Sequence, residues 1–372
     1  MKKLKEILYK VAIEGILGST EVAISDISFD SRKVNKGTMY VAIKGTQHDG
    51  HQYIEQAVAS GAQSVLCEIL PQQRSAGVVY IQVEDSKEAL GWVAANYFDK
   101  PSRELTLIGI TGTNGKTSIA SMLYELFRTS PSPSGLISTV AIQYGDLYYP
   151  ATHTTPDPVS INQHLSAMVN LGIENCFMEV SSHGIHQRRI SGLEFDGAVF
   201  TNLTHDHLDY HKTFKAYRDT KKILFDSLSK SAFALVNADD KNGKFMLQNC
   251  KGKTHTYALH TLADFSAQIM ENQFKGMLLK IDQKEVWTQL VGEFNAYNLL
   301  AVFSVAQLLG KDPWETLKSI SQLQSVKGRF QTFESSGKVM IVIDYAHTPD
   351  ALKNVLLTIN KIRTLNENLI TV

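Results

Sequence analysis

The hydrophobic positions of this chain fall into two patterns that alternate along its length. Short continuous apolar runs, bounded by polar residues, occur at 105–110, 176–180, 197–203, 234–236 and 339–343. Runs of this length predict strands buried on both faces. Between them, apolar residues recur at helical spacing, as at 119–127, 217–228 and 292–309. This alternation predicts an α/β fold built on parallel sheets.

The first hundred residues predict a small α/β unit of their own. Apolar runs predict strands at 22–24, 27–29, 39–43, 65–67 and 78–81. Helical spacing predicts helices over 53–60 and 85–98. Asp99-Lys100-Pro101-Ser102 then breaks the second helix, because proline cannot continue it. We therefore place the first domain at residues 1–100.

The last forty residues predict the start of another α/β unit. A strand at 339–344, a loop at 345–350 and a helix at 351–362 are followed by a second apolar segment at 368–372. One such β-α-β fragment cannot cover both faces of a parallel sheet. We therefore expect residues 332–372 to begin a third domain that is truncated by about a hundred residues. We expect residues 101–331 to form the central domain. Apolar and polar residues alternate over 253–291, which predicts a side sheet within this domain.

Composition narrows the classes of partner. The length of 372 residues is typical of two or three domains.

The numbers of Lys plus Arg and of Asp plus Glu are equal at 37 each, which argues against nucleic acid or an anionic membrane as the main partner. The three cysteines, Cys67, Cys176 and Cys250, match no disulfide framework or zinc spacing, and indicate a reduced, cytoplasmic setting. Since no apolar run reaches about 18 residues, we expect no membrane insertion.

The strongest chemical signal lies between the strand at 105–110 and the helix that follows it. Its sequence is G-I-T-G-T-N-G-K-T at 109–117. Glycines let backbone N–H groups surround phosphate oxygens, Lys116 can reach the β- and γ-phosphates, and the Thr117 hydroxyl can bind Mg²⁺. Ile110 stands where the strict phosphate-loop pattern has its first glycine. The alternative is a glycine-rich turn without a ligand.

Polar residues follow the next strands as well. Glu179 ends the strand at 176–180, where it is either a Mg²⁺ ligand or an ion-pair partner of Arg188 or Arg189. The segment at 204–211 is T-H-D-H-L-D-Y-H, a density of His and Asp that suits a metal shell or a set of structural histidines. The Asn and Asp residues at 237–240 are those of an ordinary turn.

Eight motifs in one order resemble those of the Mur ligases, and among them the ligases that add the third residue of the peptidoglycan peptide. The motifs are D-S-R (30–32), T-G-T-N-G-K-T (111–117), T-T-P-D-P (154–158), M-E-V-S-S-H-G (178–184), T-N-L-T-H-D-H-L-D-Y-H (201–211), G-x-F-N-x-x-N (292–298), K-G-R (327–329) and D-Y-A-H-T-P-D (344–350). The resemblance implies a three-domain architecture. A small N-terminal UDP-binding α/β domain would precede a central phosphate-loop ATPase domain with a parallel sheet and an incomplete, Rossmann-like, amino-acid-binding C-terminal domain.

The resemblance also implies roles for individual residues. The UDP moiety would be held by Ser31, Thr46, Gln47 and His48. The muramoyl dipeptide would be held by His153, where the family often has Asn, and by Thr154, Thr155, Ser182, Gln187 and Arg189. ATP would contact Gly112, Thr113, Asn114, Gly115, Lys116, Thr117, Asn298, Arg329 and Asp344, with His347 nearby.

The catalytic and metal-binding roles follow from the same motifs. The resemblance implies that Lys116, Lys221 and His207 are catalytic, and that magnesium is bound by Thr117, Glu179, His207 and Lys221. Lys221 matches the family's Tyr-x-x-x-Lys spacing from Tyr217 and would be carbamylated (N6-carboxylysine), so that a cation becomes an anionic oxygen ligand. Lys222 would then be an ordinary surface residue.

The implied reaction is ATP-dependent amide bond formation through an acyl phosphate, in cytoplasmic peptidoglycan precursor synthesis. The substrates would be UDP-N-acetylmuramoyl-L-alanyl-D-glutamate and meso-diaminopimelate, with L-lysine as the alternative amino acid, and the protein would be a monomer without a nucleic-acid partner. Two other interpretations are a different ligase of the superfamily, such as a folylpolyglutamate synthetase, and a non-catalytic nucleotide-sugar-binding fragment. Because the third domain is expected to be incomplete, we expect substrate binding with little or no ligation.

Overall fold

The computed structural model describes residues 1–45, 48–128, 132–336, 339–363 and 367–372. The chain forms two compact units. Unit 1 contains Met1–Thr106, Pro156–Gly172 and His183–Glu194, and unit 2 contains Leu107–Thr155, Ile173–Ser182 and Phe195–Val372. Residues 332–372 therefore group with the central part of the chain, and the predicted limits of the three domains stay predictions.

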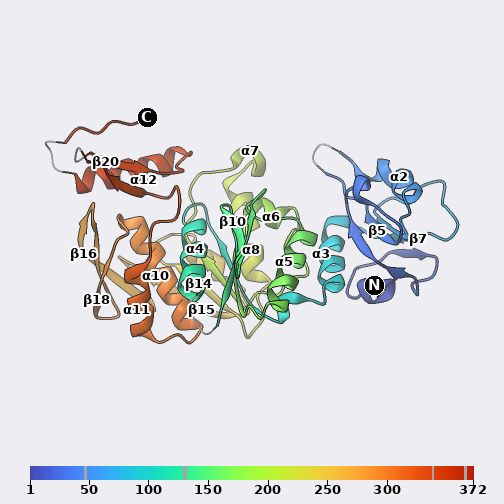
Figure 1. The fold of residues 1–372 in the computed structure, drawn as a ribbon, viewed down its shortest axis with the longest axis horizontal. Helices are drawn as coiled ribbons and strands as arrows, with labels where there is room; N and C mark the ends of the chain where they lie inside the picture. The colour runs from blue at the N-terminus through green and yellow to red at the C-terminus, as the bar shows by residue number, and fades with distance from the viewer. Residues whose placement is uncertain (46–47, 129–131, 337–338, 364–366) are drawn as a thin grey trace. The chain divides into compact units, whose positions relative to one another are not determined.

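Unit 1 is built on a mixed five-stranded sheet (blue in Figure 1). Its strand order is β2 (Gly15–Leu17), β7 (Val79–Gln82), β6 (Ser64–Cys67), β5 (Thr38–Val41) and β4 (Asp26–Ser28). β4 to β7 pair in parallel, and β2 joins the edge antiparallel to β7. The predicted strands are confirmed here within two residues, apart from β2, which the sequence analysis missed.

Both faces of this sheet are covered, which explains its continuous apolar strands. In β5, Met39 and Val41 face one hydrophobic cluster, and Tyr40 faces the other. The first cluster includes apolar residues of α1 (Leu4–Ile7) and α3 (Ser86–Tyr97), and the second those of α2 (Ile54–Ala59). Because successive side chains of a strand point to opposite faces, a strand covered on both faces is mostly apolar along its length.

The remaining elements of unit 1 are short or lie outside the sheet. α5 (Pro158–Asn170) packs along α3, and Asp157 caps its start by accepting a hydrogen bond from Ser160 N, with Pro158 in the first turn. The others are β1 (Lys2–Lys3), β3 (Ala23–Ile24), η1 (Ser31–Lys33), η2 (Gly50–Tyr53) and η3 (Pro101–Arg103).

Unit 2 is organised around a long mixed sheet whose centre is β8 (Thr106–Thr111). β12 (Asn175–Glu179) and β13 (Gly197–Phe200) flank β8, and β14 (Phe233–Asn237) and β15 (Lys253–Ala258) continue beyond β13. β13 is parallel to β8, with Phe200 opposite Thr111. This register places the segments that follow β8 and β13 side by side at the carboxyl edge, where open α/β sheets bind ligands.

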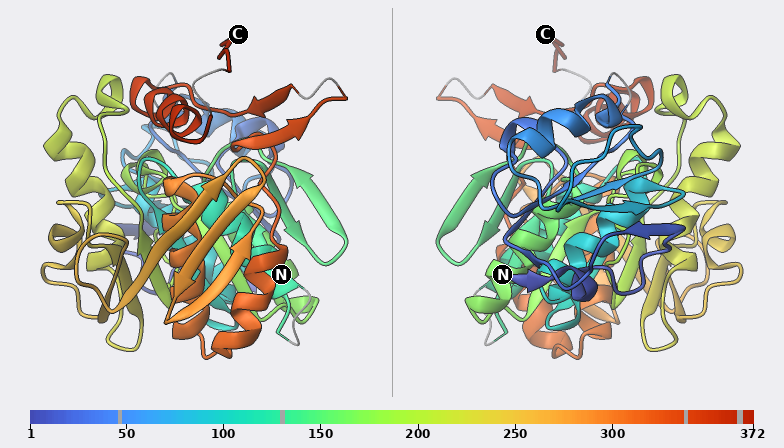
Figure 2. Two further views of the ribbon diagram at one scale, coloured as in Figure 1. Left: turned by 90° about the vertical axis from the view of Figure 1, so that its left-hand side faces the viewer. Right: turned by 90° about the vertical axis from the view of Figure 1, so that its right-hand side faces the viewer.

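One end of this sheet is antiparallel and was not predicted. β9 (Ser134–Ile137) lies parallel to β12, whereas β10 (Ala141–Tyr144) and β11 (Leu147–Pro150) form a hairpin beside it. Figure 2 shows this hairpin (green) projecting at the sheet edge. The sequence at 141–150 lacks a long apolar run because Gln143, Gly145 and Asp146 interrupt it, and all four residues of β11 are exposed.

The predicted side sheet is a continuation of the main sheet. β16 (Phe265–Gln273) pairs in parallel with β15, and β17 (Gly276–Ile281) and β18 (Lys284–Thr288) follow as an antiparallel meander. Alternating burial along β17 and β18 explains the period-two pattern. The expectation of β strands over 253–291 is thus confirmed, and that of a separate sheet is wrong.

Helices α4 (Lys116–Arg128) and α10 (Glu293–Leu308) form the main core of unit 2 with the sheet. α10 is apolar around most of its surface because it packs against both α4 and the strands. Unit 2 also contains α7 (Leu208–His211), α8 (Phe214–Asp226), α9 (Gly243–Leu247) and α11 (Pro313–Gln322), and α6 (Ser182–His186) crosses from one unit to the other.

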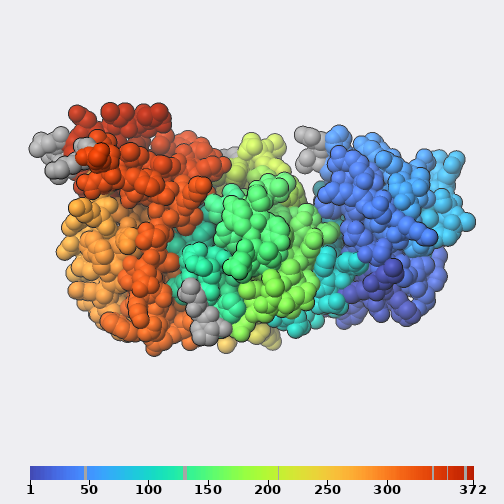
Figure 3. Space-filling view, viewed as in Figure 1, coloured from blue at the N-terminus to red at the C-terminus, as the bar shows by residue number. Residues whose placement is uncertain are grey.

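The C-terminal segment differs from the predicted β-α-β fragment. β19 (Gln331–Glu334) and β20 (Met340–Ile343) form an antiparallel pair, and α12 (Pro349–Ile362) follows. No strand forms over 368–372, because a strand needs a hydrogen-bonding neighbour and none of the described strands pairs with this segment. Ile359 packs with Val291 and Phe330, so that the segment lies against the rest of unit 2 (red in Figure 3).

Among the described residues, no helix is long and apolar enough to cross a membrane.

Candidate active site

The phosphate-loop segment lies between the end of β8 and the start of α4, as predicted. Gly112 has a φ of +146°, and a Cβ there would lie 1.9 Å from the Thr201 Oγ1 atom. Gly115 has a φ of +91°, and a Cβ there would lie 2.6 Å from the Asn298 Oδ1 atom. Both positions therefore require glycine for backbone conformation and for space. The missing first glycine at Ile110 is explained because Ile110 is a fully buried residue of β8.

The segment after β13 holds this loop in place. Thr113 N donates to Asn202 O (2.8 Å), and Asn114 N donates to Asn202 Oδ1 (2.9 Å). Thr201 Oγ1 and Asn202 Nδ2 donate to Asn114 O, at 2.6 and 3.2 Å. Thr201 and Asn202 were not among the predicted site residues, although both belong to the T-N-L-T-H-D-H-L-D-Y-H motif at 201–211.

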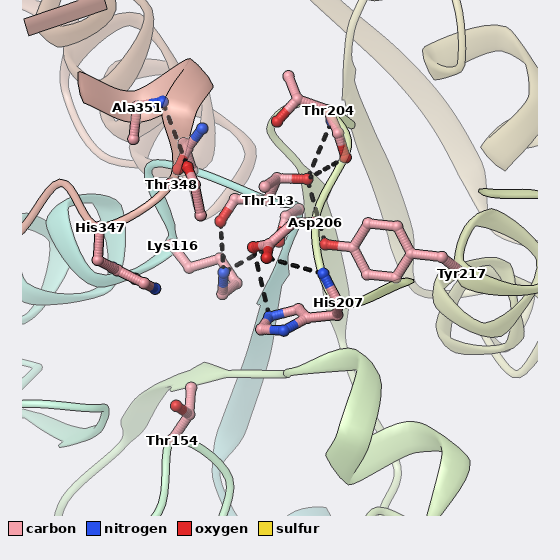
Figure 4. Close-up of polar contacts among 12 residues, drawn as sticks. Thr113, Lys116, Thr154, Thr204, Asp206, His207, Tyr217, His347, Thr348 and Ala351 are labelled. Atoms are coloured by element: carbon pink, nitrogen blue, oxygen red, sulfur yellow. Dashed lines mark hydrogen bonds and ion pairs between the residues drawn. The ribbon is translucent and has the colours of Figure 1, made fainter. Parts of the chain in front are cut away.

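Lys116 is folded back onto its own loop. Its Nζ atom donates to Gly112 O (3.0 Å) and to Thr113 O (2.8 Å), as Figure 4 shows in part. Burial lowers the pKa of this lysine, while the nearby Glu179 and Asp206 carboxylates act in the opposite direction. The ammonium group can exchange two neutral carbonyl acceptors for anionic phosphate oxygens, which form stronger hydrogen bonds.

Glu179 lies at the carboxyl end of β12 and is fully buried. It accepts hydrogen bonds from Thr139 N (2.8 Å) and Thr139 Oγ1 (3.2 Å), and its pKa is raised by burial, against the effect of Lys116. Of the two alternative ion-pair partners, Arg188 has its Nε atom 3.6 Å from Asp85 Oδ2 within unit 1. The Glu179 carboxylate also shares a hydrogen bond with the Thr117 hydroxyl. Together, these oxygen atoms suit a hard cation such as Mg²⁺.

Lys221 on α8 is 1% exposed and points toward the phosphate loop. Its Nζ atom donates to Gly112 O at 2.9 Å, and the described structure gives it no ion pair. Burial lowers its pKa well below the usual value, and the charge of Lys116 lowers it further, so that a neutral amine is favoured.

The expectation that Lys222 is an ordinary surface residue is wrong. Lys222 is 9% exposed, forms an ion pair with Asp226 and donates to Gln248 O at 2.5 Å. The helical spacing of Lys221 and Lys222 could not show this, because the second lysine is covered by the segment after α9.

His207 lies on the segment between β13 and α7, beside Asp206. Its Nε2 atom is 3.4 Å from Asp206 Oδ2, and its backbone N donates to Asp206 Oδ1 at 2.8 Å (Figure 4). Its φ is +53°, in the left-handed region that non-glycine residues rarely adopt, which often marks functional segments. Burial lowers the pKa of His207 and favours the neutral imidazole, the form that binds metals.

These side chains do not form a metal site of the usual kind. Within the described residues, no group of three or more His, Cys, Asp or Glu side chains could hold a metal ion. Only two of the four predicted magnesium ligands, one carboxylate and one imidazole, are of these types, and the others are a hydroxyl and a lysine. The finding therefore leaves the predicted magnesium site untested.

A cavity of about 430 Å³ opens beside the phosphate loop within unit 2. It is lined by Asn114 and Gly115, by residues of α10 and by residues of the C-terminal segment. The predicted ATP residues Asn298, Arg329 and Asp344 and the neighbouring His347 all line it. The structure therefore brings these distant parts of the sequence together.

Contacts with the phosphate loop or with neighbouring backbone groups hold three of these residues in place. Arg329 Nη2 donates to Thr117 Oγ1 at 3.3 Å. Asp344 accepts from Phe330 N and from Ala346 N, both at 2.7 Å, and so fixes the backbone on either side of the β19–β20 pair. Asn298 Nδ2 donates to Asn295 Oδ1 at 3.2 Å, which directs its Oδ1 atom toward Gly115.

Asp239, which the sequence analysis assigned to an ordinary turn, also lines the cavity. It accepts hydrogen bonds from Tyr297 Oη (2.8 Å) and from the backbone N–H groups of Leu259, His260 and Thr261. Burial acts to raise the pKa of Asp239, but these donors outweigh it and hold the pKa at about 2. Asp239 thus fixes the ring of Tyr297 at the cavity wall.

We expect the stability of the fold to depend on the charge of Asp239 at acid pH. Because its folded pKa is depressed, its contribution is present above about pH 4 and is lost as the pH falls toward 2. The Asp239→Asn variant should lose about 1–2 kcal/mol of unfolding free energy at pH 7 and much less at pH 2.5, after allowance for partial exposure. Urea unfolding at both pH values measures this difference. The exposed Asp146→Asn variant is the control, and equal losses at the two pH values would contradict the prediction.

Two of the predicted substrate residues of unit 2 contact Glu179 or its partner Thr139. Thr154 Oγ1 accepts from Thr139 Oγ1 at 3.2 Å. Thr155 is fully buried and donates to Glu179 O at 2.9 Å. Ser182 is 1% exposed, and its hydroxyl has no hydrogen-bond partner among the described residues. The His153 side chain is exposed and contacts Thr152 Oγ1.

The other predicted substrate residues belong to unit 1. Ser31 Oγ donates to Gln56 Oε1 at 3.4 Å, and His48 is exposed. Gln187 Oε1 accepts from Arg189 Nε (3.1 Å) and from Arg189 Nη2 (2.7 Å), so that these two residues are together. Thr46 and Gln47 lie outside the described residues. The roles of all these residues stay predictions.

Comparison with known proteins gives consistent matches along the chain. The model of the Mur ligase middle domain matches residues 110–306, and that of the Mur ligase family catalytic domain matches residues 23–98. A UDP-N-acetylmuramoyl-L-alanyl-D-glutamate–2,6-diaminopimelate ligase of Cytophaga hutchinsonii is 48% identical over 366 residues, which cover 98% of this chain and 75% of the relative. A protein of the same name from Bacteroides fragilis is 49% identical, over 100% of this chain and 76% of the relative.

A solved structure of a ligase with the same name superposes with a TM-score of 0.82 at 29% identity, over 98% of this chain and 75% of that chain. The expected α/β fold, with an N-terminal domain and a central ATP domain, is therefore confirmed. On the two family models and on the identity with relatives along almost the whole chain, this chain belongs to the Mur ligase family.

Proposed function

We propose that the chain provides the ATP and nucleotide-sugar sites of a cytoplasmic, monomeric ligase that adds meso-diaminopimelate to UDP-N-acetylmuramoyl-L-alanyl-D-glutamate. The observation that carries this proposal is the arrangement at the carboxyl edge of the unit 2 sheet. Lys116, Glu179 and Lys221 there surround a glycine-rich loop, next to a cavity that can hold a nucleotide. The relatives' names supply the identity of the acceptor and of the amino acid.

The proposed chemistry is transfer of the γ-phosphoryl group of ATP to the carboxylate of the dipeptide, followed by attack of the amino group. Two anions must approach each other in the first step, so that catalysis depends on position and on neutralisation of charge. Lys116 is placed to donate to the phosphoryl oxygens, because it already reaches both loop carbonyls. Arg329 reaches the Thr117 hydroxyl and adds a second cation near the loop.

We propose that magnesium is bound by Thr117, Glu179, His207 and carbamylated Lys221. Bound magnesium would supply positive charge that neutralises the phosphoryl oxygens. The burial of Glu179 and its hydrogen bonds from Thr139 hold the carboxylate in one orientation. The low pKa of Lys221 favours the free amine that reacts with CO₂, with release of one proton, to give an anionic carbamate.

The identity of the amino acid is tested by the mass of the product. The chain is incubated with ATP, Mg²⁺, the UDP-muramoyl dipeptide and an equimolar mixture of meso-diaminopimelate and L-lysine, and the UDP-muramoyl tripeptide is detected by mass spectrometry. Little ligation is expected of this chain, and we expect the small amount of tripeptide that forms to contain meso-diaminopimelate. A tripeptide that contains lysine would overturn this part of the proposal.

A further inference from the structure

Tyr217, in the first turn of α8, is a fully buried residue that connects three parts of the site. Its hydroxyl lies 3.1 Å from Thr113 Oγ1 in the phosphate loop. The Lys221 Nζ atom is 4.6 Å from the centre of its ring, one helical turn farther along α8. The ring of His207 lies 6.0 Å away, edge-on to it at an interplanar angle of 78°. Figure 4 shows Tyr217 pointing from α8 toward Thr113.

Thr113 has hydrogen-bonding partners on each side. Its Oγ1 atom accepts from Thr204 N at 3.0 Å and lies 3.5 Å from Thr204 O. Since the hydroxyl proton of Thr113 can point to Thr204 O, the Tyr217 hydroxyl can donate to the remaining lone pair of Thr113. Thr113 is only 7% exposed, so that water cannot easily replace this donor.

The ring of Tyr217 acts on the other side of the same loop. Lys221 Nζ donates to Gly112 O at 2.9 Å, and it does so while it lies over the Tyr217 ring. Gly112 and Thr113 are consecutive residues of the loop. One side chain therefore contacts the loop directly through its hydroxyl and holds the lysine that contacts the preceding residue.

We propose that Tyr217 is a positioning residue for nucleotide binding: its hydroxyl fixes Thr113, and its ring packs against the end of the Lys221 side chain, whose Nζ atom donates to Gly112 O. This inference rests on the proposed ATP site and adds a residue that does not itself touch the nucleotide. A loop that is held in its binding conformation needs less ordering when phosphate arrives, which strengthens binding. Loss of the hydroxyl should therefore weaken the binding of a nucleoside triphosphate without loss of the fold.

The test is calorimetric titration of the chain with Mg²⁺ and AMP-PNP, a non-hydrolysable ATP analogue. The Tyr217→Phe variant keeps the ring and lacks the hydroxyl, and we expect its Kd to rise about five- to tenfold, the usual effect of one neutral hydrogen bond. The matched control is Tyr97→Phe, which removes a hydroxyl that donates to Ser25 O in unit 1 and should leave Kd unchanged.

A double-mutant cycle distinguishes positioning through Thr113 from a general structural role. In a Thr113→Val background the hydrogen bond is already absent, so that Tyr217→Phe should cause no further loss. In a Thr113→Ser background the hydroxyl remains, and Tyr217→Phe should again raise Kd five- to tenfold. Melting temperatures of all variants establish that they are folded, and Thr113→Val tests the same bond if Tyr217→Phe does not fold.

The outcomes separate this inference from the proposed function. If the unmodified chain does not bind AMP-PNP, both are overturned. If it binds and Tyr217→Phe binds equally well, or if the effects of Tyr217→Phe and Thr113→Val simply add, the role of Tyr217 is overturned and the proposed ATP site stands.

Discussion

Replacement of Lys116 by methionine should weaken the binding of Mg²⁺ and AMP-PNP to the chain by about two orders of magnitude. The ammonium group now donates to Gly112 O and Thr113 O, and on binding it would exchange these acceptors for charged phosphate oxygens. A hydrogen bond to a charged group contributes about 1.5–3 kcal/mol, which corresponds to roughly 10- to 150-fold in affinity. Methionine retains the length and apolar stem of the side chain and lacks the charge. Calorimetric titration of the variant measures the loss.

The matched control for this prediction is Lys215→Met, on the exposed side of α8. It removes the same charge from the same unit, so that general electrostatic attraction of the nucleotide is accounted for. We expect its Kd to stay within twofold of the unmodified chain. A folded Lys116→Met variant whose affinity is within threefold of the unmodified chain would contradict a role for Lys116 in phosphate binding.

Lys221→Ala should abolish carbamate formation in the chain. In ¹³C NMR spectra recorded with labelled bicarbonate, we expect a carbamate signal from the unmodified chain and none from the variant. The reason is that burial and the charge of Lys116 lower the pKa of Lys221, so that much of the amine is neutral and can react with CO₂. The signal should increase as the pH rises through this pKa, because only the neutral amine is a nucleophile.

The same variant should lower dipeptide-dependent ADP release by about two orders of magnitude relative to the unmodified chain, the usual effect of removing one charged or hydrogen-bonding group from a transition state. Lys221→Arg should also lose the carbamate signal and most of the ADP release, because a guanidinium group stays protonated and cannot be carbamylated. Lys215→Ala, on the same helix, should retain the carbamate signal and the ADP release. Full ADP release by Lys221→Ala, or no response of the unmodified chain to bicarbonate, would overturn the assignment of Lys221.

Much of the fold could be predicted from the sequence because the strands are buried on both faces. The central residues of β5, β8, β12 and β13 are mostly apolar and all buried, and polar residues such as Thr38, Asn175 and Glu179 stand at the strand ends. The β10–β11 hairpin was missed because Gln143, Gly145 and Asp146 interrupt its apolar residues, so that no continuous run marks either strand. The pairing of β19 with β20 was missed because it depends on a partner, and a local pattern does not name partners.

The candidate site was predictable where a residue type in a motif is tied to a chemical task, as for Lys116 and Glu179. It was not predictable where the role depends on the three-dimensional neighbours. Asp239 has the sequence of a turn residue, and only the fold shows that Tyr297 and three backbone N–H groups converge on it. Lys222 was misassigned for the same reason, since its partner Gln248 lies far along the chain.

We expect the chain to recognise the UDP-muramoyl dipeptide as a whole. Calorimetric titration with UDP-N-acetylmuramoyl-L-alanyl-D-glutamate, with UDP-N-acetylmuramoyl-L-alanine and with UDP, each in the presence of Mg²⁺ and AMP-PNP, tests it most directly. We predict that the dipeptide substrate binds at least tenfold more tightly than the form without glutamate, which in turn binds more tightly than UDP. Equal affinities for the first two ligands, or no binding of the dipeptide substrate to the folded chain, would contradict the account.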